Sequence, residues 1–202
     1  QNLNLEKFLG EVEKFEYLKK RNFFEINLDD ESCYFEYDII EFLNNFNGGL
    51  NKFNPRNEKF THYYVSSTLA SDNNITSMIV DSRNNIWVGT SSGGFYFFDS
   101  LLGIFKQYHL IDHLGFSVSG SVRAIIEDSK GNLWIGTISS GLYHFNPKTV
   151  NFSHYYHDSN NSKGLNSNYI QSITEDKQGY IWVGTFGGGL NKYDPQSDEI
   201  YS

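Results

Sequence analysis

The chain has 202 residues and a formal net charge of −8 at pH 7, from 24 acidic and 16 basic side chains. Because no block of basic residues offsets this charge, nucleic acid is not expected as a partner. Aromatic residues make up 17% of the chain and prolines number three, which is typical of a sheet-rich globular protein. The sequence has no run of about 18 apolar residues, so we expect no membrane contact by this segment.

Residues 1–32 match the rest of the chain poorly. Their apolar residues between Leu5 and Leu18 have the spacing of a short amphipathic helix. The segment EKFEYL at 13–18 fits the outer strand of a sheet as well. Position along the chain favours the strand slightly, and both interpretations stay open.

Residues 33–202 are built from repeats. Three tryptophans recur about 47 residues apart, within the similar segments NIWVGTSSGGFYFFDS (85–100), NLWIGTISSGLYHFNP (132–147) and YIWVGTFGGGLNKYDP (180–195). We expect one repeat at 74–108, one at 121–156, and one at 168–202 with a truncated last strand. A degenerate copy at 33–64 precedes them, with Phe42 in the place of the tryptophan.

The copy at 121–156 shows the strand pattern most clearly. Residues 121–128 are apolar and β-branched, 132–138 follow a turn, 142–146 follow a glycine turn, and 151–156 close the unit. Four antiparallel strands that repeat every 40 to 50 residues or so are typical of a β-propeller blade. The sequence therefore predicts an all-β fold of about four propeller blades. Because the first copy is eroded and the last strand is short, we expect an open or partial propeller that self-associates or is marginally stable alone.

Three kinds of residue keep their places in the good copies. Each tryptophan is expected to fill the space between neighbouring blades. The aspartate six positions earlier is expected to cap a hairpin turn, because one carboxylate per distant turn cannot build a cation site. A glycine stands two positions after the tryptophan. These repeat residues are Asp81, Trp87 and Gly89, then Asp128, Trp134 and Gly136, then Asp176, Trp182 and Gly184.

Two motifs that suggest catalysis have simpler explanations. Residues 89–93 spell G-x-S-x-G, but that elbow requires a strand leading into a helix, and Ile138 and Phe186 replace Ser91 in the sister copies. GTFGGGL at 184–190 lacks the Lys-Ser/Thr and the helix of a phosphate loop. We expect no catalytic residue, no metal and no cofactor.

The pattern D-x-x-G/N-x-(I/L)-W-(V/I)-G-T, followed by G-(L/F) and a closing aromatic, resembles the two-component regulator propeller repeat. The resemblance covers 74–202 well and 33–73 loosely. It implies the periplasmic or extracellular sensor region of a hybrid histidine kinase of the Bacteroidetes type, which detects a small molecule or an oligosaccharide. It also implies that the chain is a fragment, whose full-length relatives carry further blades and a kinase; no kinase motif occurs in this sequence.

Residues that differ between the copies are the candidates for ligand binding. In a propeller, the loop before the first strand and the turn after the second strand emerge on the same face. The residues placed there are Thr76, Ser91, Ser92, Arg123, Ser139, Gln171 and Phe186. Arg123 is the most specific of them, because a planar five-donor fork suits a carboxylate or a row of sugar hydroxyls. The alternatives are ordinary surface polarity and an ion pair of Arg123 with Glu127 or Glu175.

Two other functions stay open at this point. A free-standing propeller could be a scaffold for protein partners, and a propeller lyase could hold a metal at the mouth of its channel. The gene neighbourhood, or the residues that follow Ser202 in a longer chain, would distinguish a sensor from a scaffold. A metal assay on the purified protein would test the lyase.

Overall fold

The computed structural model describes residues 48–54, 59–66, 70–112, 114–117, 120–159 and 164–201. The chain divides into two compact units, Gln1–Tyr37 and Asp38–Ser202, and every described residue belongs to the second. The predictions for residues 1–32, and for the part of the degenerate copy at 33–47, lie outside the described residues. No helix within the described ranges is long and apolar enough to cross a membrane.

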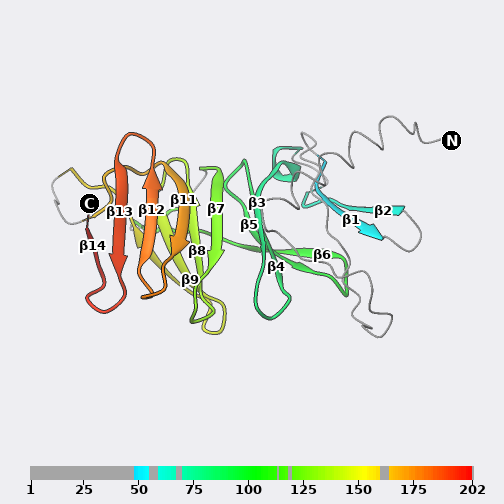
Figure 1. Cartoon of the computed structure of the whole chain (residues 1–202). Helices are drawn as coiled ribbons and strands as arrows, with labels where there is room; N and C mark the ends of the chain where they lie inside the picture. Colours follow the sequence, from blue (N-terminus) through cyan, green and yellow to red (C-terminus); the bar gives the residue numbers. More distant parts are fainter. Residues whose placement is uncertain are drawn as a thin grey trace, which may run out of the picture. The chain divides into compact units, whose positions relative to one another are not determined.

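The described residues form antiparallel sheets that follow one another in chain order (Figure 1). The first sheet has two strands, β1 (Leu50–Asn54) and β2 (Lys59–Tyr63), and the 3-10 helix η1 (Ala70–Asn73) follows it. Blade 2 consists of β3 (Ile75–Val80), β4 (Ile86–Thr90), β5 (Phe95–Asp99) and β6 (Ile104–Tyr108). Blade 3 consists of β7 (Val122–Glu127), β8 (Leu133–Thr137), β9 (Leu142–Asn146) and β10 (Asn151–Tyr155). Blade 4 consists of β11 (Ile170–Glu175), β12 (Ile181–Thr185), β13 (Gly189–Asp194) and β14 (Glu199–Tyr201).

Each blade is a four-stranded meander, in which every strand pairs with the next one along the chain. The prediction of four-stranded antiparallel propeller blades is therefore confirmed. The first strand of blade 3, β7, also contacts β3 of blade 2 and β11 of blade 4. Among the described strands no sheet closes on itself, as in a partial, open propeller.

The hairpin between the first two strands of each blade is shaped by its aspartate. In blade 3, Asp128 Oδ1 accepts hydrogen bonds from the backbone N–H groups of Lys130 and Asn132, which closes the turn. Gly131 has a φ of 78°, in the left-handed region where an L side chain is strained. Asn84 takes the same place in blade 2 with a φ of 61°, a conformation that asparagine tolerates.

The tryptophans pack between blades. Trp87 of blade 2 lies in one apolar cluster with Val122, Ile125 and Phe145 of blade 3, and its ring centroid is 5.5 Å from that of Phe145. Trp134 of blade 3 likewise packs with Ile170 and other residues of blade 4. The wedge predicted from the sequence is therefore present between blades 2 and 3 and between blades 3 and 4.

Two glycines let neighbouring blades approach closely. A Cβ atom on Gly89 would lie 2.6 Å from Cβ of Val122, and one on Gly136 would lie 2.5 Å from Cγ2 of Ile170. Each of these glycines therefore forms a socket on one blade that receives a β-branched side chain from the next blade.

A glutamate joins the blades at the hairpin end. Glu127 of blade 3 accepts hydrogen bonds from the N–H and the hydroxyl of Ser82 in blade 2, at 2.6 and 2.8 Å. Glu175 of blade 4 accepts the same pair from Ser129 in blade 3, at 2.7 and 2.6 Å. Blades 3 and 4 therefore each hold the hairpin of the preceding blade with a carboxylate.

Candidate ligand-binding surface

One end of each blade gathers the loop that leads into it and the turn after its second strand. We call it the variable end; the Asp hairpins lie at the opposite, hairpin end. A backbone hydrogen bond fixes this arrangement in every described blade: Ser91 N–H to Asn74 O (2.9 Å), Ile138 N–H to Ser121 O (3.0 Å) and Phe186 N–H to Tyr169 O (2.9 Å). The sequence-predicted candidates therefore lie at one end of their blades.

Three of the candidates occupy β-bulges. The register between the first and second strands shifts between Ile75 and Ser77, between Val122 and Ala124, and between Ile170 and Ser172. The extra residues are Thr76, Arg123 and Gln171. A bulge re-aims the side chain of its extra residue and is frequent beside binding sites. Because β7 contacts both β3 and β11, the three bulges lie on neighbouring strands.

The bulge residues differ in how the fold uses them. The Thr76 hydroxyl donates to the backbone oxygen of Val122 in the next blade, with Gly89 O at 3.2 Å as a second acceptor, so it contributes to blade packing. Arg123 and Gln171 are exposed, and neither side chain forms a hydrogen bond or an ion pair with the described residues. Their polar groups therefore remain available to a ligand.

The ion pair considered for Arg123 is not formed. Both carboxylates offered for it, Glu127 and Glu175, accept hydrogen bonds from serines at the hairpin end. Arg123 lies near the start of β7 and Glu127 at its end. The ion pair considered for Arg123 was wrong because each of the two glutamates has a serine of the preceding blade as its partner.

The turn residues also divide into two kinds. The Ser92 hydroxyl bonds to the Asp72 carboxylate and lies 2.9 Å from Thr90 Oγ1, so it holds the lead-in loop of blade 2. The Ser91 backbone also holds this loop, because its N–H group donates to the backbone oxygen of Asn74. Ser139 is exposed at the variable end of blade 3. Phe186 is 62% exposed in blade 4.

Phe186 has an aromatic neighbour that the sequence analysis missed. The ring of Tyr169 lies 5.2 Å from the ring of Phe186, at an interplanar angle of 34°. Tyr169 directly precedes β11, and its carbonyl accepts the Phe186 N–H. The two rings offer an aromatic surface next to Gln171, of the kind on which sugar rings stack. An aromatic residue immediately before a first strand was the sequence signal for it.

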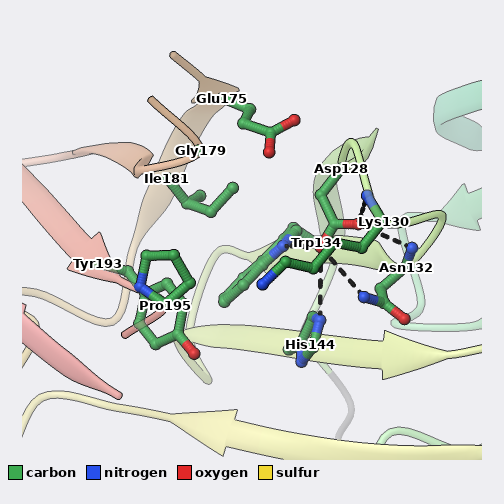
Figure 2. A pocket seen from close by; sticks show the side chains of 10 residues that line it. All are labelled: Asp128, Lys130, Asn132, Trp134, His144, Glu175, Gly179, Ile181, Tyr193 and Pro195. Atoms are coloured by element: carbon green, nitrogen blue, oxygen red, sulfur yellow. Dashed lines mark hydrogen bonds and ion pairs between the residues drawn. The ribbon is translucent and has the colours of Figure 1, made fainter. Parts of the chain in front are cut away.

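A cavity of about 70 Å³ lies at the other end of the blades, between blades 3 and 4. Figure 2 shows Asp128, Asn132 and His144 around Trp134, opposite Ile181, Tyr193 and Pro195 of blade 4. Asp128 Oδ2 accepts the indole N–H of Trp134 at 3.0 Å and lies 3.6 Å from His144 Nε2. The polar groups of Asp128, Asn132 and Trp134 bond to one another, and they thereby link the hairpin turn of blade 3 to the core between blades 3 and 4.

Burial pushes the pKa of Asp128 upward, but His144, Asn132 and Trp134 stabilise the carboxylate and bring its pKa down to about 2. Asp128 is therefore ionised throughout the physiological range and cannot serve as a general acid. In the described ranges, no three His, Cys, Asp or Glu side chains gather in a way that could hold a metal ion.

Comparisons with known proteins agree with the propeller repeat. Residues 70–92, 117–139 and 164–187 match the family model described as two component regulator propeller. A search of curated proteins gave no significant match.

Solved structures extend the likeness beyond these segments. The extracellular domain of BT4673 from B. thetaiotaomicron is described in one structure as part of a putative one component system and in another as part of a putative hybrid two component system. The first of these structures shares 27% identity with a TM-score of 0.59 over 76% of this chain. The extracellular domain of BT3049 from the same organism, described as a putative hybrid two component system, shares 25% identity with a TM-score of 0.56 over 72% of this chain. This chain covers only 18% and 17% of those two chains.

Virginiamycin B lyase from Staphylococcus aureus has the same fold at 15% identity, with a TM-score of 0.59, over 76% of this chain and 47% of its own. At that identity the likeness concerns the fold alone. The BT4673 and BT3049 structures are extracellular domains, in agreement with the localisation expected from the sequence. Three segments of the chain thus match the two component regulator propeller model, and the chain has a structural likeness to these extracellular domains.

Proposed function

We propose that this chain is a non-enzymatic, extracytoplasmic sensing segment of a two-component system, and that its variable end binds an acidic or polyhydroxyl ligand such as an oligosaccharide. The likeness to extracellular domains of two component systems supports the setting. Further blades and a kinase in a longer polypeptide would carry the signal, because the chain spans less than a fifth of those domains.

The observation that carries the binding proposal is Arg123. It occupies a bulge on β7, it is exposed, and its guanidinium forms no bond with the described residues. The equivalent residues are the neutral Thr76 and Gln171, so the blade does not need a cation at this place. A guanidinium can donate two parallel hydrogen bonds to a carboxylate, or one to each of two sugar hydroxyls. Gln171 on the adjacent strand can add donors and an acceptor.

Calorimetric titration with trigalacturonate, a carboxylate-bearing trisaccharide, tests the proposal. We expect Arg123→Gln to weaken binding about tenfold or more, because a charge-assisted bond contributes roughly 1.5 to 3 kcal/mol. Its melting temperature should fall by no more than a few degrees. The matched control is Lys148→Gln, which removes an exposed cation from the hairpin end of the same blade.

Equal affinity of wild type and Arg123→Gln would refute the role of Arg123. Equal weakening by Lys148→Gln would show that only net charge matters. Maltotriose, a neutral trisaccharide, separates recognition of carboxylate from recognition of hydroxyls.

Exposed apolar residues support a second candidate function, a scaffold for a protein partner. In the loop between blades 2 and 3, Asp112 Oδ1 accepts the N–H groups of Leu114 and Phe116, at 2.9 and 2.8 Å. This turn presents Leu114 and Phe116 to solvent, each about two thirds exposed. Binding of a protein partner that is lost with Phe116→Ser but kept with Arg123→Gln would favour this function.

A further inference from the structure

The turn after the second strand becomes more apolar from blade 2 to blade 4. The residue that follows the Gly-Thr pair is Ser91 in blade 2, Ile138 in blade 3 and Phe186 in blade 4. Ile138 is 37% exposed and Phe186 is 62% exposed, so neither side chain belongs to the core. Because a serine occupies this place in blade 2, the blade itself does not require an apolar group there. Exposed apolar side chains that the scaffold does not require indicate contact with another molecule.

The residue before the first strand follows the same trend. Asn74 and Ser121 directly precede β3 and β7, whereas Tyr169 directly precedes β11. In blade 4 the rings of Tyr169 and Phe186 lie 5.2 Å apart. Beyond its two chain neighbours, a Cβ atom on Gly187 would meet no described residue within 4 Å. The two rings therefore form an aromatic surface with open space beside it.

A cation is present at the same end of the neighbouring blade. Arg123 occupies the bulge on β7, a strand that contacts β11. Ile138 belongs to the same blade, and its N–H donates to the backbone oxygen of Ser121, two residues before Arg123. An exposed guanidinium thus shares the variable end of blades 3 and 4 with the apolar side chains of Ile138, Tyr169 and Phe186.

Few of the described polar side chains at this end are available to sugar hydroxyls. The hydroxyls of Thr76 and Ser92 form hydrogen bonds within the fold. Gln171 and Ser139 are the exposed polar candidates that accompany Arg123. A sugar on the two rings would remove several hydroxyls from water and gain few protein partners in return, which costs free energy. An aromatic ring carries no such groups, so it suits this surface better.

We infer that the variable end of blades 3 and 4 binds an aromatic carboxylate, whose ring lies against Tyr169 and Phe186 and whose acid group bonds to Arg123. A planar guanidinium can donate two parallel hydrogen bonds to a carboxylate. Contact between aromatic rings is favourable in addition to the apolar area that it buries. The inference rests on the proposed function, because it names the chemistry of the ligand at the same surface.

Calorimetric titration with cinnamate and with galacturonate compares two carboxylates of equal charge, one on an aromatic group and one on a sugar. We expect cinnamate to bind the wild-type chain about tenfold more tightly than galacturonate. Phe186→Ser introduces the residue type of blade 2 and should weaken cinnamate binding about tenfold. Arg123→Gln introduces the residue type of blade 4 and should weaken it to a similar extent. The matched control is Leu102→Ser, which removes an exposed apolar side chain from the hairpin end of blade 2 and should leave the affinity unchanged.

The outcomes separate this inference from the proposed function. Galacturonate binding as tight as cinnamate binding, or cinnamate binding that Phe186→Ser leaves unchanged, would overturn the inference. The proposed function would then still stand if Arg123→Gln weakened the binding of galacturonate. Cinnamate binding that Arg123→Gln leaves unchanged would also overturn the inference, and so would equal binding of its uncharged methyl ester. If cinnamate, galacturonate and trigalacturonate all failed to bind at millimolar concentration, the inference and the proposed function would fall together.

Discussion

At the scale of single residues, one carboxylate joins the hairpin of each blade to the tryptophan of the same blade. Asp81, Asp128 and Asp176 each accept the indole N–H of the tryptophan six residues later, at 3.0, 3.0 and 2.7 Å. The same carboxylates accept the backbone N–H groups of the turn. The constant spacing in the sequence therefore has two reasons, turn capping and the indole bond. Turn capping was predicted from the sequence, and the hydrogen bond to the indole was not, although both require the same spacing.

Stability should fall as the pH drops from about 4 towards 2. The pKa of Asp128 is about 2 in the folded chain, against an ordinary value of 3.8. Its ionised form therefore stabilises the fold above pH 4 or so, by about 2 kcal/mol, and this contribution is lost as the pH falls through the folded pKa. Burial opposes ionisation of Asp81 too, but its hydrogen bonds lower its pKa, which adds a contribution of the same sign.

Urea unfolding between pH 2 and pH 6 measures this dependence. Asp128→Asn should be less stable at pH 6 and should show a shallower loss of stability on acidification. An identical pH slope in the variant would mean that Asp128 is not one of the groups responsible.

At the scale of elements, the strands and hairpins could be predicted from the sequence, but the contacts between blades could not. β-branched runs, Asp turns and glycines are local signals, and they predicted the four strands of the copy at 121–156 nearly residue by residue. The bulges at Thr76, Arg123 and Gln171 depend on strand register, which these signals do not determine. The bonds of Glu127 and Glu175 join residues about one whole repeat apart, so local sequence contained no sign of them.

Substitution of Gly136 and Gly184 should distinguish a glycine that packs against the next blade from one that packs only within its own blade. Gly136→Ala forces a Cβ against Ile170 of the next blade, and overpacking of this kind costs about 1 to 3 kcal/mol. Gly184→Ala meets only the Ser172 side chain, which can rotate away, so its loss of stability should be clearly smaller. Chemical denaturation of both variants makes the comparison. Equal losses would show that the cost arises within each blade and not between blades.

At the scale of the whole molecule, a regular scaffold carries side chains that differ from blade to blade at one end. The repeats fix the strands, wedges and clamps, while Arg123, Gln171 and the pair Tyr169 and Phe186 vary and lie exposed or half-exposed at the variable end. The end at which these residues gather could be predicted from propeller topology. The sequence could not predict that Thr76 and Ser92 differ from these residues, because their hydroxyls form hydrogen bonds within the fold. Self-association and the division of the chain into domains remain predictions.

Mapping of a bound ligand by NMR tests the central claim most directly. On addition of trigalacturonate to the isotopically labelled chain, we expect the largest shift changes at Arg123, Gln171 and Ser139 and at the rings of Tyr169 and Phe186, with the Asp hairpins unaffected. The Arg123→Gln chain should lose the changes at all of these residues together. Changes confined to the hairpin end or to Leu114 and Phe116, or no change at millimolar ligand, would contradict the assignment of the variable end as the binding surface.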